Sequence, residues 1–166
     1  LFQEPAVATD LKTQGTHLYF VKPGTPAGTA VKVTCPTGIS GLGGAADQID
    51  VTCLDATDDR AYVRGLGNPG QVTVPFVLKA GDVSHADLVA LKEAGTSVEW
   101  MVCMSDATTV PVVTTSTNSF TALTTRSNIK FSGYVADLTL DGATNEVWRG
   151  TMTIQRSGAW TITWKA

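Results

Sequence analysis

Alternation of apolar and polar residues with a period of two runs through most of this chain. Seven segments show it: 31–35, 49–53, 72–78, 98–104, 129–140, 148–154 and 160–164. Successive side chains of a β-strand point to opposite faces, so each segment is predicted to be a half-buried strand. Pro75 falls inside one of them, which favours an edge or bulged strand because proline cannot donate to a ladder. A mainly β fold is expected.

One segment breaks this pattern and predicts a helix over about 84–94. Ser84 and Asp87 have the spacing of a capping box, in which two side chains satisfy the first free N–H groups of a helix. Gly95 supplies the residue type that most often ends a helix in the left-handed conformation. The combination predicts a β-sandwich or partial barrel with one flanking α-helix.

The chain has 166 residues and shows no internal repeat or linker, so a single domain over 1–166 is expected. We expect an N-terminal arm over 1–14 and two long loops, over 55–70 and 107–125. Loops of this length in small domains commonly carry function.

The surface of this protein is predicted to be poor in charge. Charged residues make up 16% of the sequence, against roughly 25% in an ordinary soluble domain. Hydrophobic residues reach 43%, which is enough for a real core. A chain with so few charges is expected to bury much of its surface against partners, although a Thr-rich β-domain is the simpler reading.

Charge and cysteine content exclude several other classes. The net charge of −3, without a Lys/Arg cluster, argues against nucleic-acid binding. No run approaches the ~20 apolar residues of a membrane span, so no membrane segment is expected. Cys35, Cys53 and Cys103 are odd in number and lack CxxC spacing, which argues against disulfides and zinc. Each lies in or beside an alternating run and is predicted to be a reduced core residue.

No catalytic site can be assembled from the sequence. The chain has only two histidines, His17 and His85. Ser84, His85 and Asp87 are residue types that occur in catalytic triads. Neighbouring residues of a helix point in different directions, so these side chains are not expected to converge. His17 is expected to be an exposed strand residue. We therefore predict that the protein is not an enzyme.

Cofactor and metal sites are not expected either. Asp55, Asp58 and Asp59 share one loop, but the calcium-loop spacing is missing, so a solvated acidic loop is predicted. The glycine-rich segment 38–44 lacks a phosphate-binding motif, and its glycines are expected to permit a tight turn or close backbone contact. Trp100, Trp148, Trp160 and Trp164 could stack on a sugar, but core or subunit-interface positions are favoured.

An ordered set of short motifs carries a family resemblance. Gln14-Gly15-Thr16 precedes the first strand and is followed by the glycine-rich segment, then by Ile49-Asp50-Val51-Thr52-Cys53-Leu54-Asp55, Arg60, Tyr62, Gly65-Leu66 and Pro69-Gly70. This order resembles the tail tube (major tail) proteins of long-tailed, lambda-like bacteriophages. The sequence departs from the pattern at Cys53, where Thr is expected.

The resemblance implies a structural virion protein that self-assembles into stacked rings of six. These rings would form the tail tube through which DNA passes into the host, without specific binding. It implies a location in the virion tail after assembly in the bacterial host cytoplasm. Expected partners are further copies of the chain, the tape measure protein, and tail terminator or tip proteins.

Candidate contact residues follow from this resemblance. The loop after 49–55 would reach the neighbouring ring, so Asp55, Asp58, Asp59 and Arg60 are candidates for ring-to-ring contacts. Asp137 and Thr139 are candidates for the lumen wall. The alternatives are a tube subunit of a related contractile or secretion apparatus, and a carbohydrate-binding β-sandwich.

Overall fold

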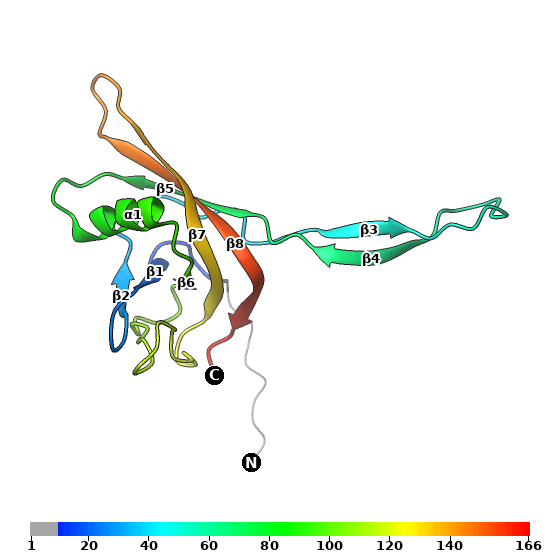
Figure 1. Ribbon diagram of the computed structural model, residues 1–166. Coiled ribbons are helices and arrows are strands. Elements are labelled where there is room, and N and C mark those ends of the chain that lie inside the picture. The colour runs from blue at the N-terminus through cyan, green and yellow to red at the C-terminus, as the bar shows by residue number, and fades with distance from the viewer. Residues whose placement is uncertain (1–9) are drawn as a thin grey trace, which may run out of the picture. The chain divides into compact units, whose positions relative to one another are not determined.

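The computed structural model describes residues 10–166, so most of the expected arm 1–14 lies outside the described residues. The strands in chain order are β1 (His17–Lys22), β2 (Thr29–Lys32), β3 (Ala46–Asp50), β4 (Tyr62–Gly67), β5 (Gln71–Val77), β6 (Val98–Cys103), β7 (Asn128–Asp141) and β8 (Arg149–Thr163) (Figure 1). The helix α1 (Val83–Ala94) lies between β5 and β6 in sequence. The predicted mainly β fold with a helix near 84–94 is confirmed.

Six strands form one sheet in the order β2-β1-β6-β7-β8-β5, and β3 and β4 form a separate two-stranded ribbon. The chain divides into two compact units. Unit 1 contains the residues up to Val33 together with Val98–Lys130 and Trp160–Ala166. Unit 2 contains Thr34–Ser97 and Phe131–Ala159.

The core of unit 1 forms around β1, in which four consecutive residues, 18–21, are buried. Alternate residues of a strand face opposite ways, so both faces of β1 are covered. On one face Phe20 packs against Trp100, with ring centroids 5.4 Å apart. The opposite face holds a cluster of buried residues: Tyr19, Val21, Met101, Cys103 and Phe120.

A buried arginine organises the connection from β6 to β7, which contains the predicted loop 107–125. Arg126 is completely buried. Its guanidinium donates hydrogen bonds to the carbonyl oxygens of Met104 (2.6 Å), Thr109 (3.1 Å), Gly15 (2.9 Å) and Cys103 (3.3 Å). A buried charge is tolerated when its donors are satisfied in this way, so one side chain fixes several backbone segments of unit 1.

Replacing this side chain tests its structural role. Arg126→Met should lower the free energy of unfolding by about 3 kcal/mol or more, because four backbone carbonyls lose a charged donor at a fully buried position. Chemical denaturation measures the change. The matched control is Arg149→Met at an exposed site, which should change stability by less than about 0.5 kcal/mol. An Arg126→Met variant as stable as the wild type would contradict this assignment.

In unit 2, β5 and β8 pair antiparallel along the full length of β5, from Gln71 opposite Gln155 to Val77 opposite Arg149. Alternate side chains of this pair form the buried core of the unit: Val72, Val74, Phe76, Met152 and Ile154. β5 is the last strand of its sheet, as Pro75 predicted for an edge strand.

The glycine-rich segment and the residues just before it cover the outer edge of β5. Ser40 and Thr73 exchange two backbone hydrogen bonds, each of 3.0 Å. Gly41 has φ +84°, and a Cβ at this position would overlap the carbonyl group of Gln71. The expected close backbone contact of these glycines is therefore confirmed, and an exposed strand edge is blocked.

The start of α1 differs from the sequence prediction. Asp82, and not Ser84, is the N-cap: its carboxylate accepts from the backbone N–H groups of Ser84 (2.9 Å) and His85 (3.3 Å). Ser84 lies inside the helix, where its hydroxyl donates to the same carboxylate. A carboxylate can accept all three bonds at once, which explains why it takes the capping position. Gly95 ends the helix at φ 63°, as predicted.

Removing the cap should destabilise the protein in a pH-dependent way. The hydrogen bond from the Ser84 hydroxyl lowers the pKa of Asp82 to about 2. Asp82→Ala should therefore cost about 1 kcal/mol at neutral pH. A lowered pKa gives stability that is present above the ordinary pKa of about 3.9 and is lost toward pH 2. The melting-temperature difference from wild type should shrink over that range.

The exposed Asp141 offers a matched control. Asp141→Ala should change the melting temperature little at any pH. A stability loss in Asp82→Ala that persists undiminished at pH 2 would contradict the capping role of the ionised carboxylate.

Candidate functional site: the assembly surfaces

Residues 46–67, here called the arm, form a two-stranded ribbon that projects away from β5 and α1 of unit 2 (Figure 1). β3 and β4 are antiparallel, with Ile49 opposite Val63, and a connecting segment, 51–61, joins them. The predicted loop 55–70 is thus wrong in its second half, which is largely β4. An isolated two-stranded ribbon is marginally stable in water, so packing against something else is expected of it.

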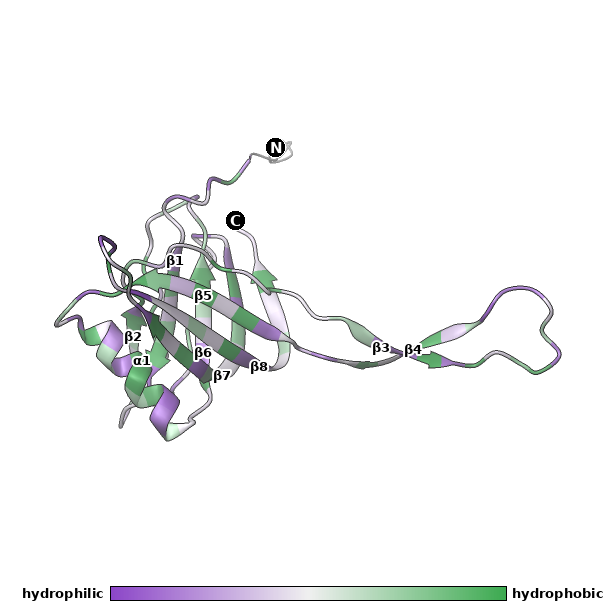
Figure 2. Ribbon diagram, turned by 90° about the horizontal axis from the view of Figure 1, so that it is seen from above, coloured by the Kyte–Doolittle hydropathy of each residue, from purple (hydrophilic) through white to green (hydrophobic). Residues whose placement is uncertain are grey.

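The two faces of the arm differ in character. Ile49 and Val63 are each 53% exposed, and Val51 follows them on the same face. The other face carries polar side chains with Tyr62 and Leu66 among them: Gln48, Asp50 and Arg64. Figure 2 shows hydrophobic residues on both strands of the arm. An uncovered apolar face on a narrow ribbon makes this side of the arm a candidate contact surface.

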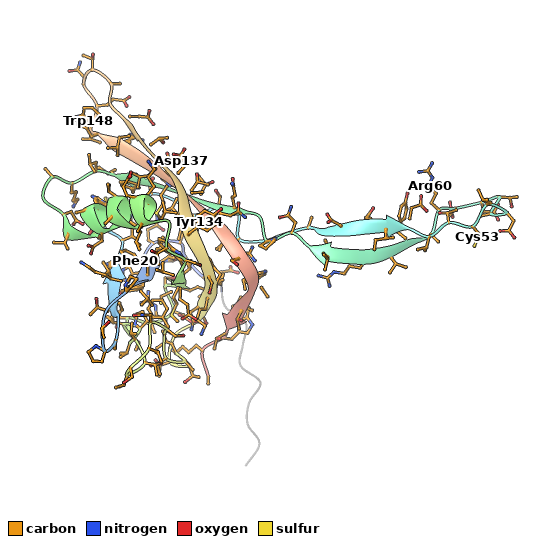
Figure 3. The ribbon with its side chains drawn as sticks, viewed as in Figure 1. Phe20, Cys53, Arg60, Tyr134, Asp137 and Trp148 are labelled. Carbon is orange, nitrogen blue, oxygen red and sulfur yellow. The ribbon has the colours of Figure 1, made fainter. Side chains whose placement is uncertain are left out.

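The predicted ring-contact residues all lie in the connecting segment of the arm. Asp55, Asp58, Asp59 and Arg60 are exposed there, and Figure 3 shows Arg60 toward the far end of the arm. Leu54 beside them is completely exposed. The fold thus places charged side chains and a large apolar one on the same projecting segment.

The cysteine prediction was wrong for two of the three residues. Cys35 and Cys53 are exposed, and only Cys103 is buried. Figure 3 places Cys53 at the far end of the arm, where no core exists to receive it. The alternating pattern around it reflects the amphipathic ribbon and not a core strand. Burial raises the pKa of the Cys103 thiol to about 11, so this thiol is also poorly nucleophilic.

Thiol labelling of the isolated subunit tests this arrangement. At neutral pH a maleimide should modify Cys35 and Cys53 rapidly and Cys103 only after unfolding, because the thiolate is the reactive form. Mass spectrometry of the intact protein and its peptides identifies the modified sites. Rapid modification of Cys103 in the folded protein, or protection of Cys53 in the monomer, would contradict the structure.

The predicted lumen residues lie on β7 in unit 2. Leu138 and Leu140 line a pocket together with Phe76, so Asp137 and Thr139, which alternate with them, point away from that pocket. Both are exposed. The Asp137 carboxylate accepts a 2.9 Å hydrogen bond from the N–H of Leu138. These two side chains therefore share the outward side of β7.

The outward face of the β5–β8 pair is uncharged over most of its length. Facing residues pair there as Gln71 with Gln155, Thr73 with Thr153, and Pro75 with Thr151. All six are partly or fully exposed. We call this set the neutral face. Hydroxyl and amide groups give it polarity without a net charge.

The histidines show no catalytic geometry. The Nε2 atom of His85 lies 3.0 Å from the carbonyl oxygen of Thr34, and its Nδ1 accepts from the N–H of Lys79 at 3.3 Å. Both ring nitrogens are thus engaged by the backbone. His17 is half-buried rather than exposed, because its ring lies beside Arg126, with 3.4 Å between Nδ1 and the guanidinium. Burial lowers the pKa of His17.

Three further observations bear on possible sites. Within residues 10–166, no three His, Cys, Asp or Glu side chains are grouped to hold a metal ion. In the same range, no helix has the length and apolar character needed to cross a membrane. Of the tryptophans, Trp100 is a core residue, whereas Trp148, Trp160 and Trp164 are exposed.

The fold recurs in solved tube-forming assemblies. The SPP1 tail tube matches with a TM-score of 0.67 at 10% identity, over 93% of this chain and 79% of that one. The sheath-tube complex of the PVC extracellular contractile injection system matches with a TM-score of 0.64 at 12% identity, over 95% and 94% of the two chains. At these identities the likeness establishes a shared fold alone.

Sequence comparison identifies the family. The model of the lambda-like phage tail tube proteins matches residues 9–166. Structural protein 3 of Pseudomonas phage PAJU2 is 36% identical over 151 residues, which cover 89% of this chain and 90% of that protein. The chain belongs to the lambda-like phage tail tube family and is a structural protein of the virion tail.

Proposed function

We propose that this subunit polymerises into stacked rings whose cohesion depends on the arm. The observation that carries the proposal is the arm itself, a projecting ribbon with an uncovered apolar face and a fully exposed Leu54. Burial of this apolar face is the main source of free energy by which the arm can associate with another surface. In a homopolymer, the surface that buries it belongs to another copy of the same chain.

The reach of the arm fits a contact between rings. From Ala46 to Leu54 the chain advances eight residues, or about 26 Å if extended at about 3.3 Å per residue. This distance carries Asp55, Asp58, Asp59 and Arg60 well away from the rest of unit 2. We assign these four side chains to ring-to-ring contacts, where charges fix orientation and register around an apolar centre.

Ring closure follows from the type of contact. A head-to-tail contact repeated by rotation gives a closed ring when the angle closes, and repeated along the axis it gives a stack. Six subunits per ring is the number implied by the family resemblance. The charge-poor surface suits such contacts, since few charges must be removed from water as the faces meet.

We assign the neutral face, with Asp137 and Thr139 beside it, to the wall of the lumen. Its hydroxyl and amide groups offer phosphate little electrostatic attraction, and the exposed Arg149 lies only at the end of this face. The net charge of −3 per subunit, multiplied around a ring, would repel DNA weakly. DNA would therefore slide through without specific binding. No catalytic step or cofactor is needed for this role.

Other partners would meet the tube at its ends and inside it. The tape measure protein would occupy the lumen during assembly in the host cytoplasm, and terminator or tip proteins would close the two ends. The likeness to a contractile sheath-tube complex supports a second candidate, a tube that works inside a sheath. A sheath protein encoded beside this one would favour that candidate.

Electron microscopy of the concentrated subunit tests the proposal. The wild-type chain should form hollow filaments with ring symmetry. A variant in which Asn-Gly replaces residues 49–63 should stay folded, because a two-residue turn closes the ribbon without touching the core. It should form no filaments, since the apolar contact is lost. Val112→Asp, a change at an exposed apolar site outside the arm, should still assemble.

Two results would contradict the proposal. Filaments formed by the shortened variant in normal yield would show that the arm is dispensable. A wild-type chain that stays monomeric at every concentration, and is absent from virion tails by mass spectrometry, would rule out the tube.

A further inference from the structure

We infer that the surface which receives the arm is an apolar pocket beside α1, here called the helix pocket, on a second copy of the chain. This inference rests on the proposed self-assembly and names the partner surface of the arm. The helix pocket belongs wholly to unit 2 and encloses about 430 Å³. Its main apolar lining residues are Phe76, Leu78, Val83, Val89, Leu138 and Leu140.

The helix α1 carries two apolar stripes, and only one of them contributes to the core. Leu88 and Leu91 are buried on the core side. Val83, Ala86 and Val89 recur every three residues along another side, which is the spacing of one helix face. All three line the helix pocket, and Val83 is 68% exposed. A surface helix normally has a polar outer face, so this second stripe lacks a cover within unit 2.

The polar groups near the pocket are already engaged by the chain itself. The His85 ring nitrogens face the backbone at Thr34 and Lys79. The Asp82 carboxylate caps α1 through the backbone N–H groups that follow it. Small-molecule sites depend on a few polar groups aimed into the cavity. Inserted apolar side chains suit the helix pocket better than a polar ligand.

Figure 1 shows the arm projecting from unit 2 on the side away from α1, whose residues line the helix pocket, so a subunit does not fill its own pocket. The arm of another copy can do so. Each subunit then has one donor and one acceptor, a head-to-tail contact that extends without limit. Such a contact builds a stack, whereas two arms that met each other would give only a closed dimer.

Opposite charges are present at the two surfaces. The pocket lining has one exposed cation, Lys79, and one carboxylate, Asp82, which is engaged by the N–H groups that it caps. The end of the arm carries three carboxylates and one guanidinium around the exposed Leu54: Asp55, Asp58, Asp59 and Arg60. An apolar side chain inserted between a lysine and a group of carboxylates gains orientation from the charges and binding energy from burial. We therefore infer that the arm of a second copy of this chain fills the helix pocket.

Chemical crosslinking tests the pairing directly. The native thiol of Cys53 lies next to Leu54 on the donor surface, and Val89→Cys adds a thiol to the acceptor. In a Cys35→Ser background, a short bis-maleimide should link these two thiols between copies. Because every subunit has both, a denaturing gel should show a ladder of dimers, trimers and longer chains. The matched control, Val112→Cys in the same background, should give no ladder beyond that of the background alone.

A charge placed in the pocket provides the second test. Val83→Asp puts a carboxylate in the first turn of α1, where an acid is favourable, so the monomer should keep its melting temperature. Tube yield should fall about tenfold or more, because the carboxylate would have to be buried beside Leu54. Val112→Asp should leave the yield unchanged.

The outcomes separate this inference from the function it rests on. Wild-type tubes combined with no Cys53-to-Val89→Cys ladder, or with normal assembly of Val83→Asp, overturn the pocket as acceptor and leave the tube intact. Crosslinking that stops at dimers overturns the head-to-tail pairing. A wild-type chain that forms no tube overturns the proposed function and this inference together.

Discussion

A two-stranded ribbon has no interior in which to bury apolar side chains. This constraint determines which surface of the protein is left for contact with other molecules. Two paired strands cannot cover both of their own faces, so Ile49 and Val63 stay half exposed although both are strongly apolar. The connecting segment leaves Leu54 entirely in solvent. In a protein that works alone, such a surface would be an aggregation hazard. In a tail tube subunit we propose that it becomes a specific contact surface, provided that the rest of the chain resists other associations.

The remainder of the structure supplies that resistance. The segment around Ser40 pairs with the edge of β5, so this edge is blocked against pairing with foreign strands. Arg126 fixes the β6–β7 connection through hydrogen bonds to four backbone carbonyl oxygens. The Asp82 cap secures the start of α1, whose second apolar stripe lines the helix pocket.

Alternation predicted the β class and most strands well, because burial of one sheet face imposes it directly. The pattern does not show which surface covers the apolar face of each strand. The run around Ile49 and Cys53 has the same pattern as a core strand, yet it belongs to an amphipathic ribbon in solvent. β4 was missed because Gly65 and Gly67 interrupt its pattern and glycine is a poor strand former. The helix cap was placed two residues late, since Ser84 and Asp82 are both favourable caps and only the fold distinguishes them.

The candidate contact residues came from the resemblance and not from the pattern alone. Asp55 and its neighbours proved to lie on the projecting segment, but the apolar face beside them was hidden by its likeness to a core strand. The signal that could have revealed it is a strand rich in apolar residues that leads into an acidic, polar loop. The helix pocket was beyond sequence reasoning, because its walls come from β5, α1 and β7 and only the fold brings them together.

Hydrogen exchange of the arm, compared between the isolated subunit and the assembled tube, measures whether neighbouring copies cover it. We expect the backbone amides of residues 46–67 to exchange rapidly in the monomer and to become strongly protected in the tube. The amides of the buried strand β1 should be protected in both states. Arm amides that exchange equally fast in monomer and tube would contradict the claim that neighbouring copies cover this ribbon.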